Sequence, residues 1–148
     1  MASPPETRPQ SAETFLAIVR TAEELQRGFA ELFKAHDLSL AQYNVLRILR
    51  GAGPVGLTCS DVANSLIRHD PDVTRLLDRL DRRGLIDRGR DPKDRRVVRT
   101  RITKAGEVLL AKLDGPVDAL HARQLGHVSD KRLAELAALL EEAGAGGK

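Results

Sequence analysis

The feature that most constrains the fold is an abrupt change of hydrophobic period at Gly84. Before it, Asp70 and Pro71 predict the start of a helix whose apolar residues recur at helical spacing. These apolar residues are Val73, Leu76, Leu77 and Leu80. After it, residues 85–88 and 97–102 predict two short strands around a charged turn. This stretch therefore predicts a helix that leads directly into a β-hairpin.

Two further helices precede this one, and each begins at a capping signature. Ser39 and Gln42 form the first signature, which predicts a helix that ends near Gly51. Thr58 and Asp61 form the second, which opens a short helix that stops a few residues before the next one. Two helices separated by so short a turn are typical of a helix-turn-helix.

Long helices are predicted on both sides of this unit. Toward the N-terminus, apolar or near-apolar residues recur at a spacing of three then four, which predicts a helix with a narrow packing seam. The seam residues are Phe15, Ile18, Ala22, Leu25, Phe29, Leu32 and His36. Toward the C-terminus we expect helices over 103–120, bent near Gly115 and Pro116, and over 129–140. The fold class we expect is therefore mainly α with a small β-hairpin wing, a winged helix-turn-helix.

Positive charge is concentrated in the predicted helix and hairpin. Residues 68–101 hold 12 Lys and Arg against 7 Asp and Glu, whereas the whole chain has a net charge of +3. A basic segment of this kind suits a surface that binds phosphates.

On the predicted helix, the side opposite the apolar face is polar and basic. It carries Arg75, Asp78 and Arg82, with Thr74 and Arg79 beside them. An arginine on such a helix can bond a guanine bidentately in the major groove of DNA. A solvated amphipathic helix explains the same face, but the succession of capped helix, tight turn, basic helix and Arg-rich hairpin favours DNA binding.

The hairpin turn carries Lys93, Arg95 and Arg96, which can reach phosphates or a narrow minor groove. Asp94 lies two residues before Arg96, close enough to orient its guanidinium. The alternative is that Asp94 serves only to form the turn.

Four segments together resemble the MarR family of bacterial regulators. They are VTRLLDRLDRRGLI (73–86), DPKDRR (91–96), ITKAG (102–106) and LSLAQYNVL (38–46). The resemblance implies a homodimer whose first and last helices interleave, with two winged heads on a palindromic DNA site. It divides the chain into a disordered tail (1–11), a dimerisation helix (12–37), a winged helix-turn-helix (38–103), C-terminal dimerisation helices (104–143) and a second disordered tail (144–148).

The resemblance also implies which residues contact double-stranded DNA. The contacts that the resemblance implies on the recognition helix are Thr74 and Arg75, to which the polar face of that helix adds Asp72, Asp78 and Arg79. Those of the wing are Arg88, Arg90, Lys93, Asp94, Arg95 and Arg96, with Arg96 in the minor groove, Asp94 as its partner and the other four mainly on phosphates. The acidic start of the helix departs from the family pattern: Asp72 either stabilises the helix dipole or accepts a hydrogen bond from a cytosine.

Many members of this family bind small phenolic or anionic effectors in a crevice between the dimerisation and DNA-binding parts. Five residues could line such a crevice here, namely Phe29, Leu32, His36, Tyr43 and Arg47. Apolar residues at helical spacing are also explained as plain core, and His36 as a helix-end residue that interacts with the dipole.

Catalysis, metal binding and membrane insertion are not expected. The four histidines have no metal-ligand spacing, and the sequence has neither a Gly-rich phosphate loop nor a nucleophile elbow, so we expect no enzyme and no cofactor. A module for protein contacts is the stronger alternative, which the Arg-rich wing disfavours. The single cysteine, Cys59, suits a buried core thiol or, at a helix N-terminus, a redox role. Without a signal peptide or a membrane-length apolar stretch, we expect a cytoplasmic protein.

Overall fold

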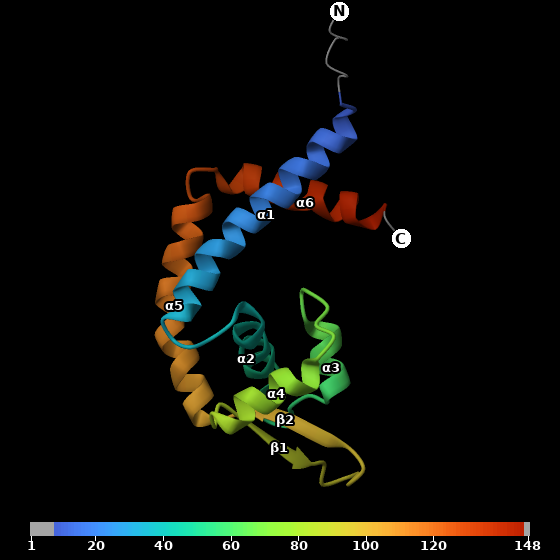
Figure 1. Ribbon diagram of the computed structural model, residues 1–148, viewed down its shortest axis with the longest axis vertical. Helices are drawn as coiled ribbons and strands as arrows, with labels where there is room; N and C mark the ends of the chain where they lie inside the picture. Colours follow the sequence, from blue (N-terminus) through green and yellow to red (C-terminus); the bar gives the residue numbers. More distant parts are fainter. Residues whose placement is uncertain (1–7, 147–148) are drawn as a thin grey trace, which may run out of the picture.

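A computed structural model describes residues 8–146 of the chain, and Figure 1 shows their arrangement. Six α-helices, one 3-10 helix and two strands follow one another in these residues. In order they are α1 (Gln10–Lys34), α2 (Leu40–Ala52), η1 (Gly53–Val55), α3 (Cys59–Ser65), α4 (Val73–Arg82), β1 (Ile86–Arg90), β2 (Val98–Ile102), α5 (Lys104–Leu125) and α6 (Asp130–Ala145). The expected fold class, mainly helical with a two-stranded antiparallel wing, is confirmed.

Both predicted capping boxes are present. The Ser39 side chain accepts a hydrogen bond from the Gln42 N–H, and the Gln42 side chain accepts one from the Ser39 N–H. Thr58 and Asp61 make the same reciprocal pair at the start of α3. The hydrogen bonds from Thr58 hold the pKa of the Asp61 carboxyl below its usual value. Local sequence therefore sets where α2 and α3 begin.

The predicted start of the next helix, α4, was wrong by two residues. Asp72, not Asp70, is the N-cap, because its side chain accepts a hydrogen bond from the Arg75 N–H. The Asp70 side chain instead accepts one from the Asp72 N–H at 2.9 Å, so residues 70–72 form a turn. Pro71 therefore lies in the turn and not at the first helical position.

The core lies where α2, α4, α5 and the hairpin meet. The whole predicted apolar face of α4 is buried there. The strands pair from Ile86 with Ile102 to Arg90 with Val98, and Thr100 forms an additional antiparallel bridge to Leu57. The buried apolar interior fixes α4 and the hairpin together in one head.

The two ends of the chain are more helical than predicted. α1 begins at Gln10, inside the tail expected for residues 1–11, and α6 continues to Ala145, inside the tail expected for 144–148. Helix propagation is favourable once a turn has formed, so polar and alanine residues extend both helices. The remaining tail residues, 1–7 and 147–148, lie outside the described residues. α5 passes through Gly115 and Pro116 as one helix.

α1 and α6 lie away from the head, and α6 crosses α1 near the middle of α1 in the view of Figure 1. α6 has no buried residue, and Phe33 is the buried residue of α1. Large apolar side chains stand exposed on both helices, namely Phe15, Ile18, Val19, Leu136, Leu139 and Leu140. Within residues 8–146, no helix is long and apolar enough to cross a membrane.

Candidate nucleic-acid interface

The outward face of α4 presents the residues that the sequence predicts for the recognition helix. Thr74, Arg75 and Arg79 are exposed on the side away from the buried face. Asp72 lies at the N-terminal end of this face and Asp78 is half-buried beside it. The face is thus polar and basic and is backed by a rigid core, as a helix that enters the major groove requires.

Asp72 and Arg75 are paired. The Arg75 N–H donates to Asp72 Oδ1 at 3.1 Å, and Arg75 Nε lies 3.1 Å from Asp72 Oδ2. The arginine side chain is nevertheless 70% exposed. One carboxylate therefore caps the helix and fixes the direction of the guanidinium.

Asp78 and Arg88 are also paired with each other. Arg88 Nη2 lies 2.8 Å from Asp78 Oδ1 and 3.4 Å from the Thr74 carbonyl oxygen. This arginine is half-buried, since 24% of its side chain is exposed. The structure thus places Arg88 between the wing and α4, with little of it left for the phosphate contact that the sequence predicts.

The wing tip holds the exposed basic residues. Lys93, Arg95 and Arg96 are exposed, and the side chain of Arg96 is 93% exposed. Asp94 Oδ1 accepts hydrogen bonds from both the N–H of Arg96, at 3.0 Å, and its Nε, at 3.3 Å. Asp94 therefore both helps to form the turn and orients the Arg96 guanidinium.

Two residues that the sequence did not single out, Arg99 and Arg101, stabilise the base of the wing. Arg99 Nε donates to Asp91 Oδ2 at 2.5 Å, and this bond holds the pKa of the Asp91 carboxyl below its usual value. Arg99 also reaches the Gly56 carbonyl oxygen, and Arg101 donates to that of Pro54. Arg90 donates to the Arg95 carbonyl oxygen at 2.6 Å, which stiffens the tip. The signal available was the strand period, which places Arg99 and Arg101 on one face of β2.

Cys59 is exposed, so the expectation of a buried core thiol was wrong. It is the first residue of α3, and its Sγ lies 3.9 Å from Thr74 Oγ1 on α4. Cys59 thus lies beside α4 and outside the core, which α3 reaches through Val62.

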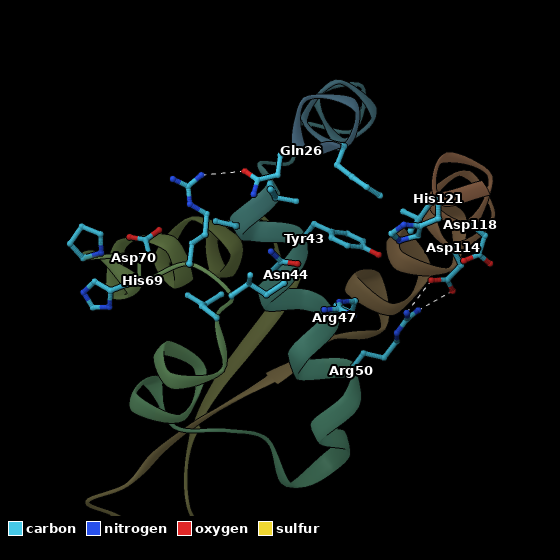
Figure 2. A pocket seen from close by; sticks show the side chains of 18 residues that line it. Gln26, Tyr43, Asn44, Arg47, Arg50, His69, Asp70, Asp114, Asp118 and His121 are labelled. Carbon is cyan, nitrogen blue, oxygen red and sulfur yellow. Dashed lines mark hydrogen bonds and ion pairs between the residues drawn. The ribbon is translucent and has the colours of Figure 1, made fainter. Parts of the chain in front are cut away.

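A crevice of about 720 Å³ lies between the head and the long helices, and Figure 2 shows the side chains that line it. Phe29, Tyr43 and Arg47 of the predicted set line it, whereas Leu32 and His36 do not. Leu32 packs against the core, and the His36 carbonyl oxygen accepts a hydrogen bond from Arg83. The lining of the crevice therefore includes three of the five residues that the sequence suggests for it.

The crevice is lined by four parts of the chain, namely α1, α2, α5 and the turn between α3 and α4. Arg50 of α2 makes two hydrogen bonds of 3.0 Å to Asp114 of α5, which raise the pKa of the guanidinium. Arg68, in the turn between α3 and α4, donates to Gln26 of α1 at 3.4 Å. Tyr43 points across the crevice toward α5 in Figure 2, and burial raises the pKa of its hydroxyl. No sequence pattern indicates that the α3–α4 turn forms one wall of the crevice.

No cluster of three or more His, Cys, Asp or Glu side chains that could hold a metal ion occurs among the described residues. The site consists instead of a basic helix, a basic wing and the crevice behind them.

Comparison with known proteins agrees with this geometry. A family model described as the MarR family matches residues 38–98. An uncharacterized HTH-type transcriptional regulator of Bacillus subtilis, YkoM, is 32% identical over 138 residues, which cover 85% of this chain and 88% of that protein.

Solved structures give the same result. A MarR transcription factor from Planctomyces limnophilus has 42% sequence identity and a TM-score of 0.70, over 92% of this chain and 98% of that one. A mutant MarR from E. coli complexed with operator DNA has 26% identity and a TM-score of 0.77, over 86% of this chain and 90% of that one. The chain therefore belongs to the MarR family of winged helix-turn-helix proteins: it is a DNA-binding transcriptional regulator and not an enzyme.

Proposed function

We propose that this chain is a homodimeric repressor that binds a palindromic operator in a sequence-specific manner and releases it in response to a small effector. The observation that carries the proposal is the Asp78–Arg88 ion pair, which ties the wing to α4. The exposed Arg75 and the exposed Arg96 are thereby held in one rigid head. One head can then engage the major groove and an adjacent minor groove together.

The exposed apolar residues of α1 and α6 support the homodimer. Phe15 is 64% exposed and Leu139 is 63% exposed in the single chain. Contiguous apolar surface of this kind marks a protein interface, and most such interfaces in small regulators are two-fold symmetric. Two heads related by a two-fold axis would read half-sites about 10 base pairs apart.

Repression follows from occupancy. A dimer that spans two half-sites covers DNA that RNA polymerase needs when the site lies within a promoter. The E. coli relative with this fold was crystallised with operator DNA. We place this chain in the same role, acting in the cytoplasm where bacterial DNA lies.

The crevice supports an effector. Its walls come from α1, α2, α5 and the α3–α4 turn, so a molecule bound there contacts the DNA-reading part and the long helices at once. Phe29 and Tyr43 supply aromatic surface, and Arg47 supplies positive charge. This lining favours a small phenolic or anionic molecule.

Footprinting of the purified chain on the DNA that flanks its own gene tests the proposal. We expect two protected half-sites, an affinity that falls steeply with salt, and release by at least one member of a panel of phenolic carboxylates. One unrepeated half-site would contradict the dimer. A flat salt titration would instead favour a protein-binding module.

A further inference from the structure

The Asp72–Arg75 pair repeats, on the recognition helix, the arrangement found at the wing tip. In both places an aspartate accepts a hydrogen bond from the backbone N–H of a following arginine and forms an ion pair with its Nε, at 3.1 Å for Arg75 and 3.3 Å for Arg96. At the wing the pair is Asp94 with Arg96. In both pairs the arginine side chain stands mostly exposed.

The pairing through Nε determines what Arg75 can still bind. A guanidinium has five N–H donors in a planar fork, and the two Nη nitrogens form its end. Within residues 8–146 neither Nη nitrogen of Arg75 has a hydrogen-bond partner. Those two donors match the O6 and N7 acceptors that guanine presents in the major groove.

We infer that Asp72 holds Arg75 as a reader of guanine, so that each half-site contains a G·C pair at the position beneath the start of α4. This inference rests on the proposed function, because it assumes that α4 enters the major groove. It makes Asp72 a positioning residue and not a direct base contact. Asp72 Oδ1 already accepts a hydrogen bond from the Arg75 N–H and Asp72 Oδ2 lies 3.1 Å from Arg75 Nε, which leaves a cytosine amino group the weaker explanation.

Preorganisation gives the pair its effect on specificity. A free arginine samples many rotamers and must be ordered when it binds, whereas a guanidinium fixed by a carboxylate loses less freedom. The negative charge of Asp72 also repels phosphates, so the pair lowers affinity for arbitrary DNA. Both effects favour the correct base over general backbone binding.

Site selection with the full chain is the first part of the test. The probe is a pool of duplexes whose randomised centre spans two half-sites about 10 base pairs apart. We expect wild type to prefer guanine at one position of each half-site, by about 5- to 150-fold over the other bases. Arg75→Ala should remove the preference at that position and leave the others.

Asp72→Asn is the decisive variant, because asparagine caps a helix as well as aspartate does but carries no charge to hold the guanidinium. We expect its guanine preference to fall by about fivefold or more, while its affinity for unrelated duplex DNA stays equal or rises. Asp72→Ser, which also keeps a cap, should behave alike and serves as the second variant. Asp70→Asn is the matched control: it neutralises a neighbouring carboxylate for which no arginine partner is found within residues 8–146, and it should leave the preference intact.

Equal guanine preference in wild type and in both Asp72 variants would overturn the inference. So would a change of base preference caused by Asp72→Asn in an Arg75→Ala background, because a residue that acts through Arg75 has no effect once Arg75 is absent. A wild-type chain that selects no sequence at all would instead overturn the proposed function. Thermal unfolding of each variant separates these outcomes from loss of the fold.

Discussion

The head and the long helices of this protein differ in how completely a single chain buries their apolar side chains. The head consists of α2, α3, α4 and the wing, and it has a buried apolar core in which Leu46, Leu49 and Leu80 are fully buried. The two arms, which are residues 10–28 of α1 together with all of α6, contain no buried residue. A single chain therefore completes the core of the head but not the packing of the arms.

This difference matters because burial of apolar area supplies most of the stability of a fold, at about 25 cal/mol per Å². The arms gain that stability only when a second surface covers them. Association and stability of the arms are therefore linked, and both should depend on protein concentration, whereas the core of the head should respond to its own packing. Substitutions in the arms and in the head test this contrast.

Leu136→Asp in the arm should have the largest effect. A charge buried without a partner costs several kcal/mol, and a symmetric dimer would contain it twice. We expect the variant to sediment as a monomer with a folded head and to lose high-affinity DNA binding. Analytical ultracentrifugation and gel shifts measure the two losses.

Ala138→Asp is the matched control for that substitution. It adds the same charge to α6 two residues later, about 200° around the helix and away from the leucine face. It should leave the mass of the dimer unchanged. A Leu136→Asp chain with the mass of wild type would contradict the role of the arms as the dimer interface.

Leu77→Ala should destabilise the head. Leu77 is buried, and its truncation should cost about 2 to 5 kcal/mol in the free energy of unfolding. Urea unfolding at several protein concentrations measures the loss, which should be the same at each. Leu139→Ala deletes the same atoms from the exposed arm, and its smaller loss should vary with concentration; identical behaviour of the two variants would remove the contrast.

Arg96→Ala should weaken operator binding by about 1 to 3 kcal/mol without changing the mass of the dimer, because it alters the head alone. Fluorescence anisotropy on the selected operator measures the change. Arg95→Ala removes a second exposed wing arginine and should act mainly on phosphate binding, which would lower the salt slope by about 1. Unchanged affinity of Arg96→Ala would exclude the wing from DNA recognition.

Asp91→Asn should have the smallest effect, and the effect should depend on pH. Arg99 depresses the pKa of Asp91 in the folded state, so the ion pair stabilises the head above the ordinary aspartate pKa of about 3.9. The stabilisation is lost as the pH falls through the lower, folded-state pKa. The difference in Tm between wild type and variant should be constant near neutral pH and vanish in strong acid; a difference that persists there would show that Arg99 does not act through the charge.

Short-range patterns allowed much of the head to be predicted. The capping boxes at Ser39 and Thr58 and the buried face of α4 depend on residues within a few positions of each other, and the two strands lie on either side of one charged turn. The start of α4 was misjudged because Asp70 and Asp72 both suit an N-cap, and only the path of the turn selects between them. The local sequence alone is therefore compatible with either aspartate as the N-cap of α4.

By itself, the sequence determined the order of helices and strands, the capped helix starts, the basic face of α4 and the exposed arginines of the wing tip. Tertiary structure decided which charges pair, that Arg88 serves the Asp78 ion pair, that Cys59 faces out, and that the α3–α4 turn and not Leu32 lines the crevice. The physical reason is the separation along the chain over which each kind of interaction acts. Helix caps and hydrophobic periods act within one or two turns of chain, whereas ion pairs and crevices depend on the angles at which distant elements pack.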